Sequence, residues 1–251
     1  MKFFLIIGGT GVMGASAIRA IHEHFDKNIV IIANWYGKEI PGFEIEGANH
    51  TIFGDINDPN CRNKIKSFND GSFDYMFYAT ALGDVGIPIK DATKDQIIRS
   101  NKLSFDPIPQ LENELSIETT VAYSTFYTIR HQLSTYGAMG HSKENIEKWA
   151  VETDGTSKHA CIRAGLFESP SSRGIKLLLR KTSKNLDNLK DPLLRSYFEN
   201  SPSSEGIKKF VEGIFKEEKE EYGDCRTDKE DLFRAHLELF KSSNPTFINV
   251  C

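Results

Sequence analysis

The chain has 251 residues, of which 39% are hydrophobic and 26% are charged, and its formal net charge is −4. This length suits one large α/β domain with a sizeable buried core. A mildly acidic chain without a basic run gives no reason to expect nucleic acid or a membrane surface as a partner. The 4 cysteines are scattered and form no Cys-x-x-Cys pair. This argues against a zinc site and fits reduced thiols in the cytoplasm.

The first apolar run predicts a buried strand. Residues 3–7 are continuously apolar and are followed by two glycines, so the run is too short for a signal-peptide core or a membrane span. A short run bounded by glycines is typical of a central parallel strand that is covered on both faces. Across residues 15–25, apolar side chains then recur at helical spacing.

Strands and helices alternate along most of the chain. Further strands are predicted at 28–33, 51–53, 74–81, 119–124 and 159–162, and helices at 91–103 and 137–153. This alternation predicts an α/β fold with a doubly wound parallel sheet of the Rossmann type, formed as a single domain over residues 1–251.

The C-terminal third has a different composition. Region 169–204 is rich in Ser, Lys, Asn and Pro, and we expect a mobile loop there, with a short helix at 175–179, that covers the site. The charged run 216–224 is expected to be the solvated end of a helix, and 245–250 a last short strand.

A glycine loop joins the first strand to the first helix. Gly8, Gly11 and Gly14 have the spacing that allows a tight turn, a close backbone approach to a pyrophosphate, and close packing of helix on strand. The helix that follows offers N–H donors and positive potential to phosphates. This position predicts a nicotinamide dinucleotide site rather than a merely structural turn. Its other expected contacts are Thr10, Val12 and Met13.

The residues after the second and third strands bear on the choice of cofactor. The second strand ends at Asn34 without the acidic residue that holds the adenosine ribose of NAD, and Lys38 follows where it can meet a 2′-phosphate. NADP(H) is therefore preferred, with NAD(H) as the alternative if Lys38 is only a solvated loop residue. Asp55 is expected to accept a hydrogen bond from the adenine, with Ile56 beside it, while Asp58 caps the next helix.

Over about residues 3–180 these features resemble the short-chain dehydrogenase/reductase superfamily. The resemblance implies cofactor contacts from the segment Ala79-Thr80-Ala81, after the fourth strand, and from Asn101 in the next predicted helix. The usual Tyr-x-x-x-Lys motif is absent, because Met139 stands four residues before Lys143.

A different tyrosine spacing is present. Tyr136 stands seven residues before Lys143, and Tyr-Gly-Ala-Met-Gly-His-Ser-Lys resembles the Tyr-x6-Lys signature of the enoyl-acyl-carrier-protein reductases. The stretch 164–176 resembles the loop with which that subfamily contacts the nicotinamide end of its cofactor. It implies further cofactor contacts from Ala164, Gly165, Phe167 and Ser169. The subfamily's additional aromatic residue corresponds to Tyr127 or Phe126.

The pair Tyr136 and Lys143 suits reduction chemistry. Residues seven apart on a helix lie on one face, about 20° apart in direction and roughly 10 Å along the axis. Lys143 can hold the nicotinamide ribose, and its charge is expected to favour tyrosinate character in Tyr136. Tyr136 can donate to a carbonyl oxygen on which charge develops. The prediction is an NAD(P)H-dependent enoyl-thioester reductase of fatty acid metabolism, with Tyr136, Lys143, Ser124 and Tyr127 as catalytic residues.

Two alternatives remain open. Ser124 and Tyr136 could instead polarise a ketone, which would make the chain a carbonyl or ketoacyl reductase. Met139 and the degenerate segment 79–81 also fit a non-catalytic sensor that binds the dinucleotide. No metal is expected, because His131 and His141 have no metal-ligand companion at useful spacing. The expected partner is a small-molecule or acyl-thioester substrate. Helices that flank such sites often pair across a two-fold axis, which would give a homo-oligomer.

Overall fold

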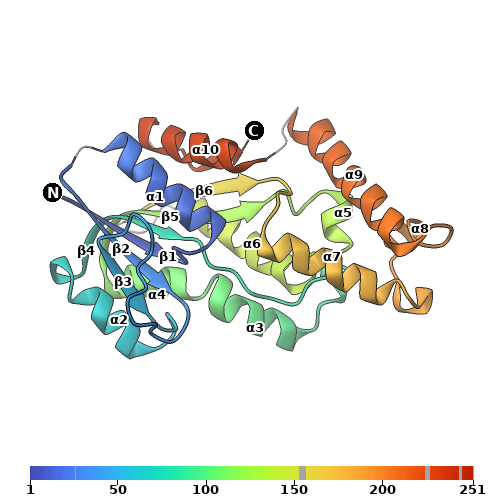
Figure 1. Ribbon diagram of the computed structural model, residues 1–251, viewed down its shortest axis with the longest axis horizontal. Helices are drawn as coiled ribbons and strands as arrows, with labels where there is room; N and C mark the ends of the chain where they lie inside the picture. Colours follow the sequence, from blue (N-terminus) through green and yellow to red (C-terminus); the bar gives the residue numbers. More distant parts are fainter. Residues whose placement is uncertain (26, 153–156, 224–226, 243–244, 251) are drawn as a thin grey trace.

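A computed structural model of the chain shows one central sheet with helices on both sides (Figure 1). The structure describes residues 1–25, 27–152, 157–223, 227–242 and 245–250. Within these residues, seven strands pair in parallel in the order β3-β2-β1-β4-β5-β6-β7. The order reverses beside β1, as in a doubly wound Rossmann fold, so the predicted fold class is confirmed.

The strands are β1 (Lys2–Ile7), β2 (Ile29–Trp35), β3 (His50–Phe53), β4 (Ser72–Tyr78), β5 (Ser116–Thr125), β6 (Lys158–Ala164) and β7 (Phe247–Val250). The helices are α1 (Val12–His24), α2 (Pro59–Lys66), α3 (Lys94–Ser104), α4 (Pro107–Glu114), α5 (Arg130–Leu133), α6 (Gly137–Ala150), α7 (Pro170–Thr182), α8 (Pro192–Ser196), α9 (Ser203–Tyr222) and α10 (Lys229–Lys241). Short 3-10 helices are η1 (Asn69–Gly71), η2 (Ile89–Asp91) and η3 (Leu186–Asn188).

Each strand predicted from the sequence is present, although most element ends are displaced by one to three residues, and two of these differences bear on the site. β4 ends at Tyr78, so residues 79–81 lie in the loop after the strand rather than in it. α6 ends at Ala150, and residue 153, the predicted end of this helix, lies outside the described residues.

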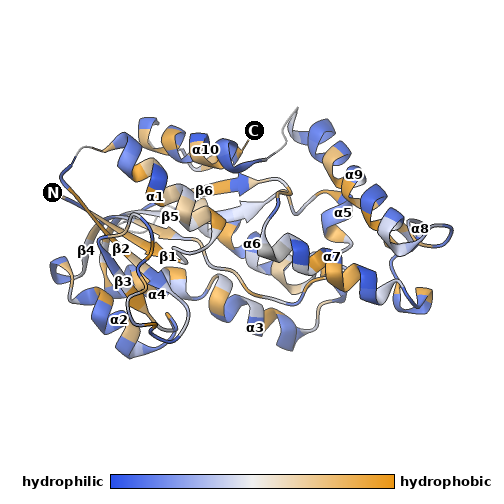
Figure 2. Ribbon diagram, in the orientation of Figure 1, coloured by the Kyte–Doolittle hydropathy of each residue, from blue (hydrophilic) through white to orange (hydrophobic). Residues whose placement is uncertain are grey.

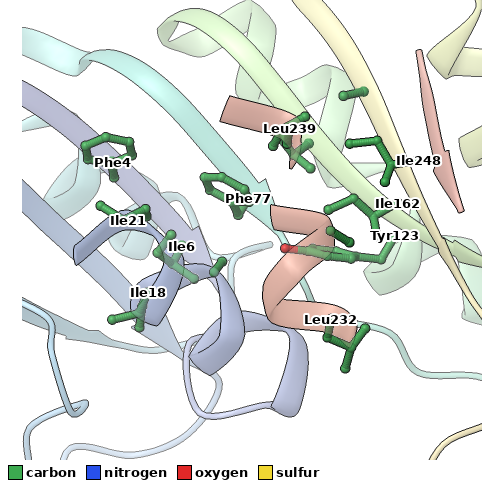
Figure 3. Packing of buried hydrophobic residues seen from close by; sticks show 14 of the residues in the cluster. Phe4, Ile6, Ile18, Ile21, Phe77, Tyr123, Ile162, Leu232, Leu239 and Ile248 are labelled. Atoms are coloured by element: carbon green, nitrogen blue, oxygen red, sulfur yellow. The ribbon is translucent and has the colours of Figure 1, made fainter. Parts of the chain in front are cut away.

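The sheet is buried on both faces, which explains why its strands are continuous apolar runs. On one face, Phe4, Ile6 and Phe77 pack against α1 and α10 (Figure 3). On the other face, Leu5 and Ile7 belong to a second cluster that includes residues of α2, α4 and α6. Figure 2 shows the contrast between the hydrophobic strands and the helices, which have hydrophobic and hydrophilic residues on different sides.

A buried histidine fastens α10 to the sheet. His236 is fully buried, and its Nε2 lies 2.7 Å from the Tyr123 hydroxyl. Its Nδ1 lies 2.6 Å from the carbonyl oxygen of Leu232, which assigns the ring proton to Nδ1. Burial lowers the pKa of His236 to about 4, so the ring is neutral near pH 7.

Region 169–204 differs from the prediction of a loop with one short helix. Helix α7 has 13 residues and begins with a capping box between Ser169 and Ser172, and η3, α8 and the start of α9 follow. A third apolar cluster that includes Leu179, Leu194 and Phe210 holds these helices together. The polar residues that suggested a loop are the solvated sides of short amphipathic helices. Whether the region moves over the site stays a prediction.

The described part of the chain contains no helix that is both long and apolar enough to span a bilayer.

Candidate dinucleotide-binding and active site

The glycine loop lies at the carboxyl end of β1 and leads directly into α1. Gly8 has φ +87°, a backbone conformation that L side chains rarely adopt. A Cβ atom on Gly14 would lie 2.4 Å from the carbonyl oxygen of Gly8, so α1 can approach the loop this closely only with glycine at that position. The N–H groups of Gly8 and Gly9 donate to the carbonyl oxygen of Asn34, at 3.2 and 3.1 Å, and tie the loop to β2.

The start of α1 leaves backbone donors available. Gly11 is the N-cap residue and makes no side-chain capping bond, and the first turn of α1 contains no acidic residue. Thr10 and Gly11 are exposed. The first N–H groups of a helix have no partner within it, and the helix dipole adds positive potential there. This end of α1 therefore fits the pyrophosphate of a dinucleotide.

A cleft of about 370 Å³ extends from this loop along the carboxyl ends of the strands. Parallel sheets of this kind bind their ligands at that edge. Many of the residues predicted from the sequence line the cleft, although they lie far apart in the chain. They are Gly8, Thr10, Gly11, Val12, Met13, Ala79, Thr80, Ala81, Ser124, Tyr136, Lys143, Ala164, Gly165, Phe167 and Ser169.

Tyr136 is the N-cap residue of α6, as predicted, and the loop after β4 fixes it there. The N–H of Gly137 donates to the carbonyl oxygen of Ile87 at 2.9 Å, and that of Ala138 to Asp84 at 2.9 Å. Gly137 has φ +50°, and a Cβ on it would lie 2.4 Å from the Asp84 oxygen. Glycine directly after Tyr136 therefore allows the loop to pack against the start of α6.

Lys143 is buried beside the same cleft. The side chain is 6% exposed, and its Nζ donates to the carbonyl oxygen of Tyr123 at 2.8 Å. Burial lowers the pKa of Lys143 to about 8, and burial raises the pKa of Tyr136 to about 12. The expected tyrosinate character of Tyr136 finds no support: burial is the cause that shifts the pKa of this phenol, and it favours the protonated form.

Ser124 lines the cleft, but its hydroxyl is used within the protein. It donates to a carboxylate oxygen of Glu147 at 2.7 Å, and the other oxygen of Glu147 accepts from Arg163 at 2.5 Å. The hydroxyl of the next residue, Thr125, donates to the carbonyl oxygen of Ala164 at 2.7 Å. These bonds join β5, β6 and α6, so in this arrangement Ser124 positions the site and directs its proton away from a substrate.

The two candidates for the additional aromatic residue do not line the cleft. Tyr127 is half-buried at the surface, where burial raises the pKa of its hydroxyl to about 12. Phe126 is buried, and its ring stacks on that of Tyr222 with centroids 3.8 Å apart. The catalytic role predicted for Tyr127 has no support in this geometry.

Six predicted cofactor contacts also lie outside the cleft lining, and one of them, Gly14, packs α1 against the loop instead. The Asn34 amide is buried and donates to the carbonyl oxygens of Ile52 and Gly54, both at 3.2 Å. Ile56 belongs to the core. The other three are Asp55, Asn101 and Lys38. Asp55 accepts a hydrogen bond from the N–H of Asn57, and Asn101 accepts one from the hydroxyl of Ser142. Lys38 is exposed. Asp58 caps α2 as predicted, by accepting from the N–H of Asn60.

Several residues that line the cleft were not predicted from the sequence. They are Trp35, Tyr36, Tyr78, Tyr123, Thr125, Gln132, Met139, Leu166, Ser172 and Ile175. Trp35 and Tyr36 stand at the carboxyl end of β2, where the expected cofactor contacts are charged side chains. Among the described residues that line the cleft, none is acidic and Lys143 alone is charged. The described part of the chain contains no group of His, Cys, Asp or Glu that could hold a metal ion.

A buried carboxyl group supports the loop after β6 from behind. One oxygen of Glu218 accepts from the N–H of Leu166 at 2.8 Å, and the other is buried without a hydrogen-bond partner. The hydroxyl of Thr227 accepts from the N–H of Gly165 at 2.8 Å. Burial raises the pKa of Glu218 to about 7. The prediction that run 216–224 is solvated is wrong at Glu218, which is 1% exposed.

Solved structures with the same fold are numerous. A short-chain dehydrogenase family protein from Francisella tularensis is 18% identical, with a TM-score of 0.60, and the match covers 100% of this chain and 97% of that chain. Levodione reductase is 13% identical, with a TM-score of 0.63 over 99% of this chain and 93% of that chain. The enoyl-[acyl-carrier-protein] reductase (NADH) of Aquifex aeolicus is 17% identical, with a TM-score of 0.55 over 85% of this chain and 88% of that chain.

No protein-family model and no curated protein sequence matches the chain. At 13–18% identity the three structures establish the fold and not the activity. The chain therefore has the fold of the short-chain dehydrogenases/reductases, which confirms at this level the resemblance inferred from its motifs.

The raised pKa of Glu218 predicts an unusual pH dependence of stability. The pKa is about 7 in the folded chain and ordinarily 4.5, so the folded state binds more protons than the unfolded state between these values. The contribution of Glu218 to stability therefore falls as the pH rises through this window, by up to about 3 kcal/mol. Glu218→Gln should abolish this fall. The free energy of unfolding of the variant minus that of wild type should therefore be larger at pH 8 than at pH 5.

Urea unfolding at the two pH values measures this difference, with Glu220→Gln as the control. Glu220 is exposed on the same helix, so its replacement should leave the pH dependence of the wild type unchanged. His236 is present in all three proteins, so its contribution to the pH dependence of stability cancels in the comparison. An equal pH effect of both substitutions, or none in Glu218→Gln, would show that the burial of this carboxyl is not what sets its proton affinity.

Proposed function

We propose that the chain is an NAD(P)H-dependent oxidoreductase that reduces the double bond of an enoyl thioester. The observation that supports this most is that the glycine loop, Tyr136 and Lys143 line one cleft at the carboxyl edge of the sheet. The first element suits a dinucleotide, and the other two suit a carbonyl oxygen and a ribose. Their chain positions span 8 to 143, so only the fold brings them together.

The residues present fit a nicotinamide dinucleotide. Gly14 has no Cβ atom, which allows α1 to pack closely against the glycine loop. The first turn of α1 then offers uncapped N–H groups for the pyrophosphate. At the other end of the cleft, the ammonium group of Lys143 has three donors, of which one is used by Tyr123. The remaining donors suit the ribose hydroxyls. When bound, the nicotinamide would supply the hydride for the reduction.

Tyr136 serves as the donor to the substrate oxygen. Because burial raises its pKa to about 12, the phenol carries its proton at neutral pH. Negative charge grows on the thioester oxygen as the double bond is reduced, so a hydrogen bond there stabilises the transition state more than the ground state. One well-aimed donor of this kind contributes about 3 kcal/mol, or two orders of magnitude in rate.

A ketone is the alternative substrate, since the same phenol can deliver a proton to a developing alkoxide. The enoyl proposal is favoured by Met139, which lines the cleft. Met139 stands four residues before Lys143, the position of the tyrosine in the commoner Tyr-x-x-x-Lys motif. The donor group is therefore Tyr136, one turn further from Lys143 along the helix. The resemblance of residues 136–143 and 164–176 to the enoyl reductases supports the same choice.

We further propose NADP(H) as the preferred cofactor. The described cleft lining has no carboxylate to hold a free ribose 2′-hydroxyl or to repel a 2′-phosphate. Lys38 lies exposed shortly after β2 and is the nearest cation along the chain to that end of the cleft. A cytoplasmic location is consistent with the free, buried thiols of Cys61 and Cys161. A homo-oligomer also stays a prediction.

Gly14→Ala should weaken cofactor binding strongly. The added Cβ would lie 2.4 Å from the Gly8 oxygen, so α1 and the loop must separate and the pyrophosphate donors must shift. We expect the NADPH dissociation constant to rise by at least about 10-fold, measured by calorimetry. Ala15→Ser also adds one heavy atom, at the neighbouring exposed position, and should change the constant little. Equal affinities of Gly14→Ala and wild type would contradict the proposed phosphate site.

Tyr136→Phe tests the reaction. With crotonyl thioester as substrate, kcat for NADPH oxidation should fall about 100-fold while NADPH affinity is unchanged, because only the oxygen donor is lost. Tyr75→Phe, on β4 among the rings of Phe4 and Phe25, is the matched control and should keep its activity. Acetoacetyl thioester in the same assay separates the alternatives. Oxidation of NADPH with this ketone and not with the enoyl compound would replace the enoyl proposal by carbonyl reduction.

Lys38→Ala tests the cofactor preference. Loss of one exposed cation should weaken NADPH binding about fivefold, as expected for a solvated ion pair, and leave NADH binding unchanged. Lys27→Ala removes an exposed lysine before β2, at the opposite edge of the sheet, and should affect neither cofactor. If wild type binds NADH more tightly than NADPH, or if Lys38→Ala weakens both equally, the preference for NADP(H) is wrong.

A further inference from the structure

The side-chain amide of Gln132 is a polar group for which the fold supplies no partner. Gln132 lies in α5, between β5 and α6, and is 3% exposed. The described residues offer its amide no side-chain hydrogen bond, and the amide faces the cleft rather than a sealed interior. The side chain lines the main cleft and also a small adjoining cavity of about 20 Å³.

Gln132 is adjacent to Tyr136 in the fold. The N–H of Tyr136 donates to the carbonyl oxygen of Gln132 at 2.8 Å, which closes one helical turn between them. Residues four apart in such a turn lie on the same face. Both side chains line the cleft, so one ligand can contact the Gln132 side chain and the phenol proposed to contact the substrate.

The backbone of α5 is held in place from the opposite side. His131 is buried, and its N–H donates to a carboxylate oxygen of Glu217 at 3.0 Å. Its Nε2 lies 2.7 Å from the hydroxyl of Tyr197. The hydroxyls of Ser134 and Thr135 bond the carbonyl oxygens one turn earlier. These bonds fix the backbone of α5 at the edge of the cleft, so the position of Gln132 does not depend on a ligand.

The Gln132 amide is not among the buried polar atoms that lack a partner, so it faces the cleft, where a ligand of matching polarity can take the place of water. The neighbours of Gln132 in the cleft include Leu166 and Ile175, which are apolar. The charged residue that lines the small cavity is Lys176, and it is paired with Glu168. A neutral group is therefore the best partner for the amide, because Lys176 is already paired and the proposed function assigns the remaining donors of Lys143 to the ribose.

We infer that Gln132 is a specificity-determining residue that hydrogen-bonds a second, neutral polar group of the substrate, an amide or carbonyl. The Cβ atoms of residues one helical turn apart are about 5–6 Å apart, so this group and the oxygen that Tyr136 contacts can belong to one small substrate. The inference rests on the proposed function for the role of Tyr136. A glutamine amide both donates and accepts, so an amide matches it best. A thioester of an N-acylated cysteamine has such an amide two methylene groups from its sulfur.

The test compares two thioesters that differ in this amide. Crotonyl-N-acetylcysteamine contains the amide, and S-pentyl thiocrotonate replaces it with methylene groups. Each is titrated by calorimetry into the protein with NADP+ present, so that no turnover occurs. The quantity of interest is the ratio of the two dissociation constants, compared between wild type and Gln132→Leu as a double-mutant cycle.

We expect the preference for the amide-bearing thioester to fall about 10-fold or more in Gln132→Leu, because the partner of the amide is lost. Gln110→Leu is the matched control: Gln110 bonds Glu114 on α4, and its replacement should leave the ratio unchanged. Gln132→Met, which is unbranched, provides a second variant if the leucine does not fold, and NADP+ affinity verifies that the site is intact. An unchanged ratio in the Gln132 variants, or no binding of either thioester to wild type, overturns the inference.

Failure of the inference is distinct from failure of the proposed function. If the ratio of the two dissociation constants depends on Gln132 but wild type does not oxidise NADPH, the proposed reductase activity is contradicted and the role of Gln132 stands. Oxidation of NADPH by wild type with a ratio that ignores Gln132 would contradict the role of Gln132 alone.

Discussion

The close approach of α1 to the loop after β1 is the contact on which the rest of the site depends. A Cβ atom at Gly14 would lie 2.4 Å from the oxygen of Gly8, so this packing requires glycine at position 14, while the φ of +87° favours glycine at position 8. It directs the free N–H groups of α1 at the carboxyl edge of the sheet. The same edge receives Tyr136 and Lys143 from α6 and the loop after β6, so one contact sets where a dinucleotide would lie relative to both.

The polar groups of the site differ in whether the fold uses them. The side chains of Ser124, Thr125 and Asn34 form hydrogen bonds that join strands to one another or to α6. The ammonium group of Lys143 uses one of its three N–H donors in a hydrogen bond to the backbone. The Gln132 amide faces the cleft and makes no side-chain hydrogen bond to the described residues. Groups that the fold satisfies hold the cleft in shape, whereas groups that it leaves unsatisfied are available to a ligand.

The sequence predicts the parts of this arrangement that are local. The parallel sheet, the glycine loop and the position of Tyr136 before α6 follow from runs and spacings within a few residues. The direction of a side chain depends on partners distant in the chain. Ser124 lines the cleft but bonds Glu147, and Tyr127 lies outside it, for reasons that no local pattern contains. Glu218 lies in a charged run, yet the packing of α9 against the loop after β6 buries it.

The central claim is that this cleft binds a nicotinamide dinucleotide, and Trp35 offers a direct measurement of it. The chain has 2 tryptophans, and Trp35 lines the cleft while Trp149 is buried on α6. Titration with NADPH, followed by tryptophan fluorescence, should give saturable quenching with energy transfer to the reduced nicotinamide. Absence of saturation with both NADPH and NADH at millimolar concentrations would contradict the account, whatever substrate is later supplied.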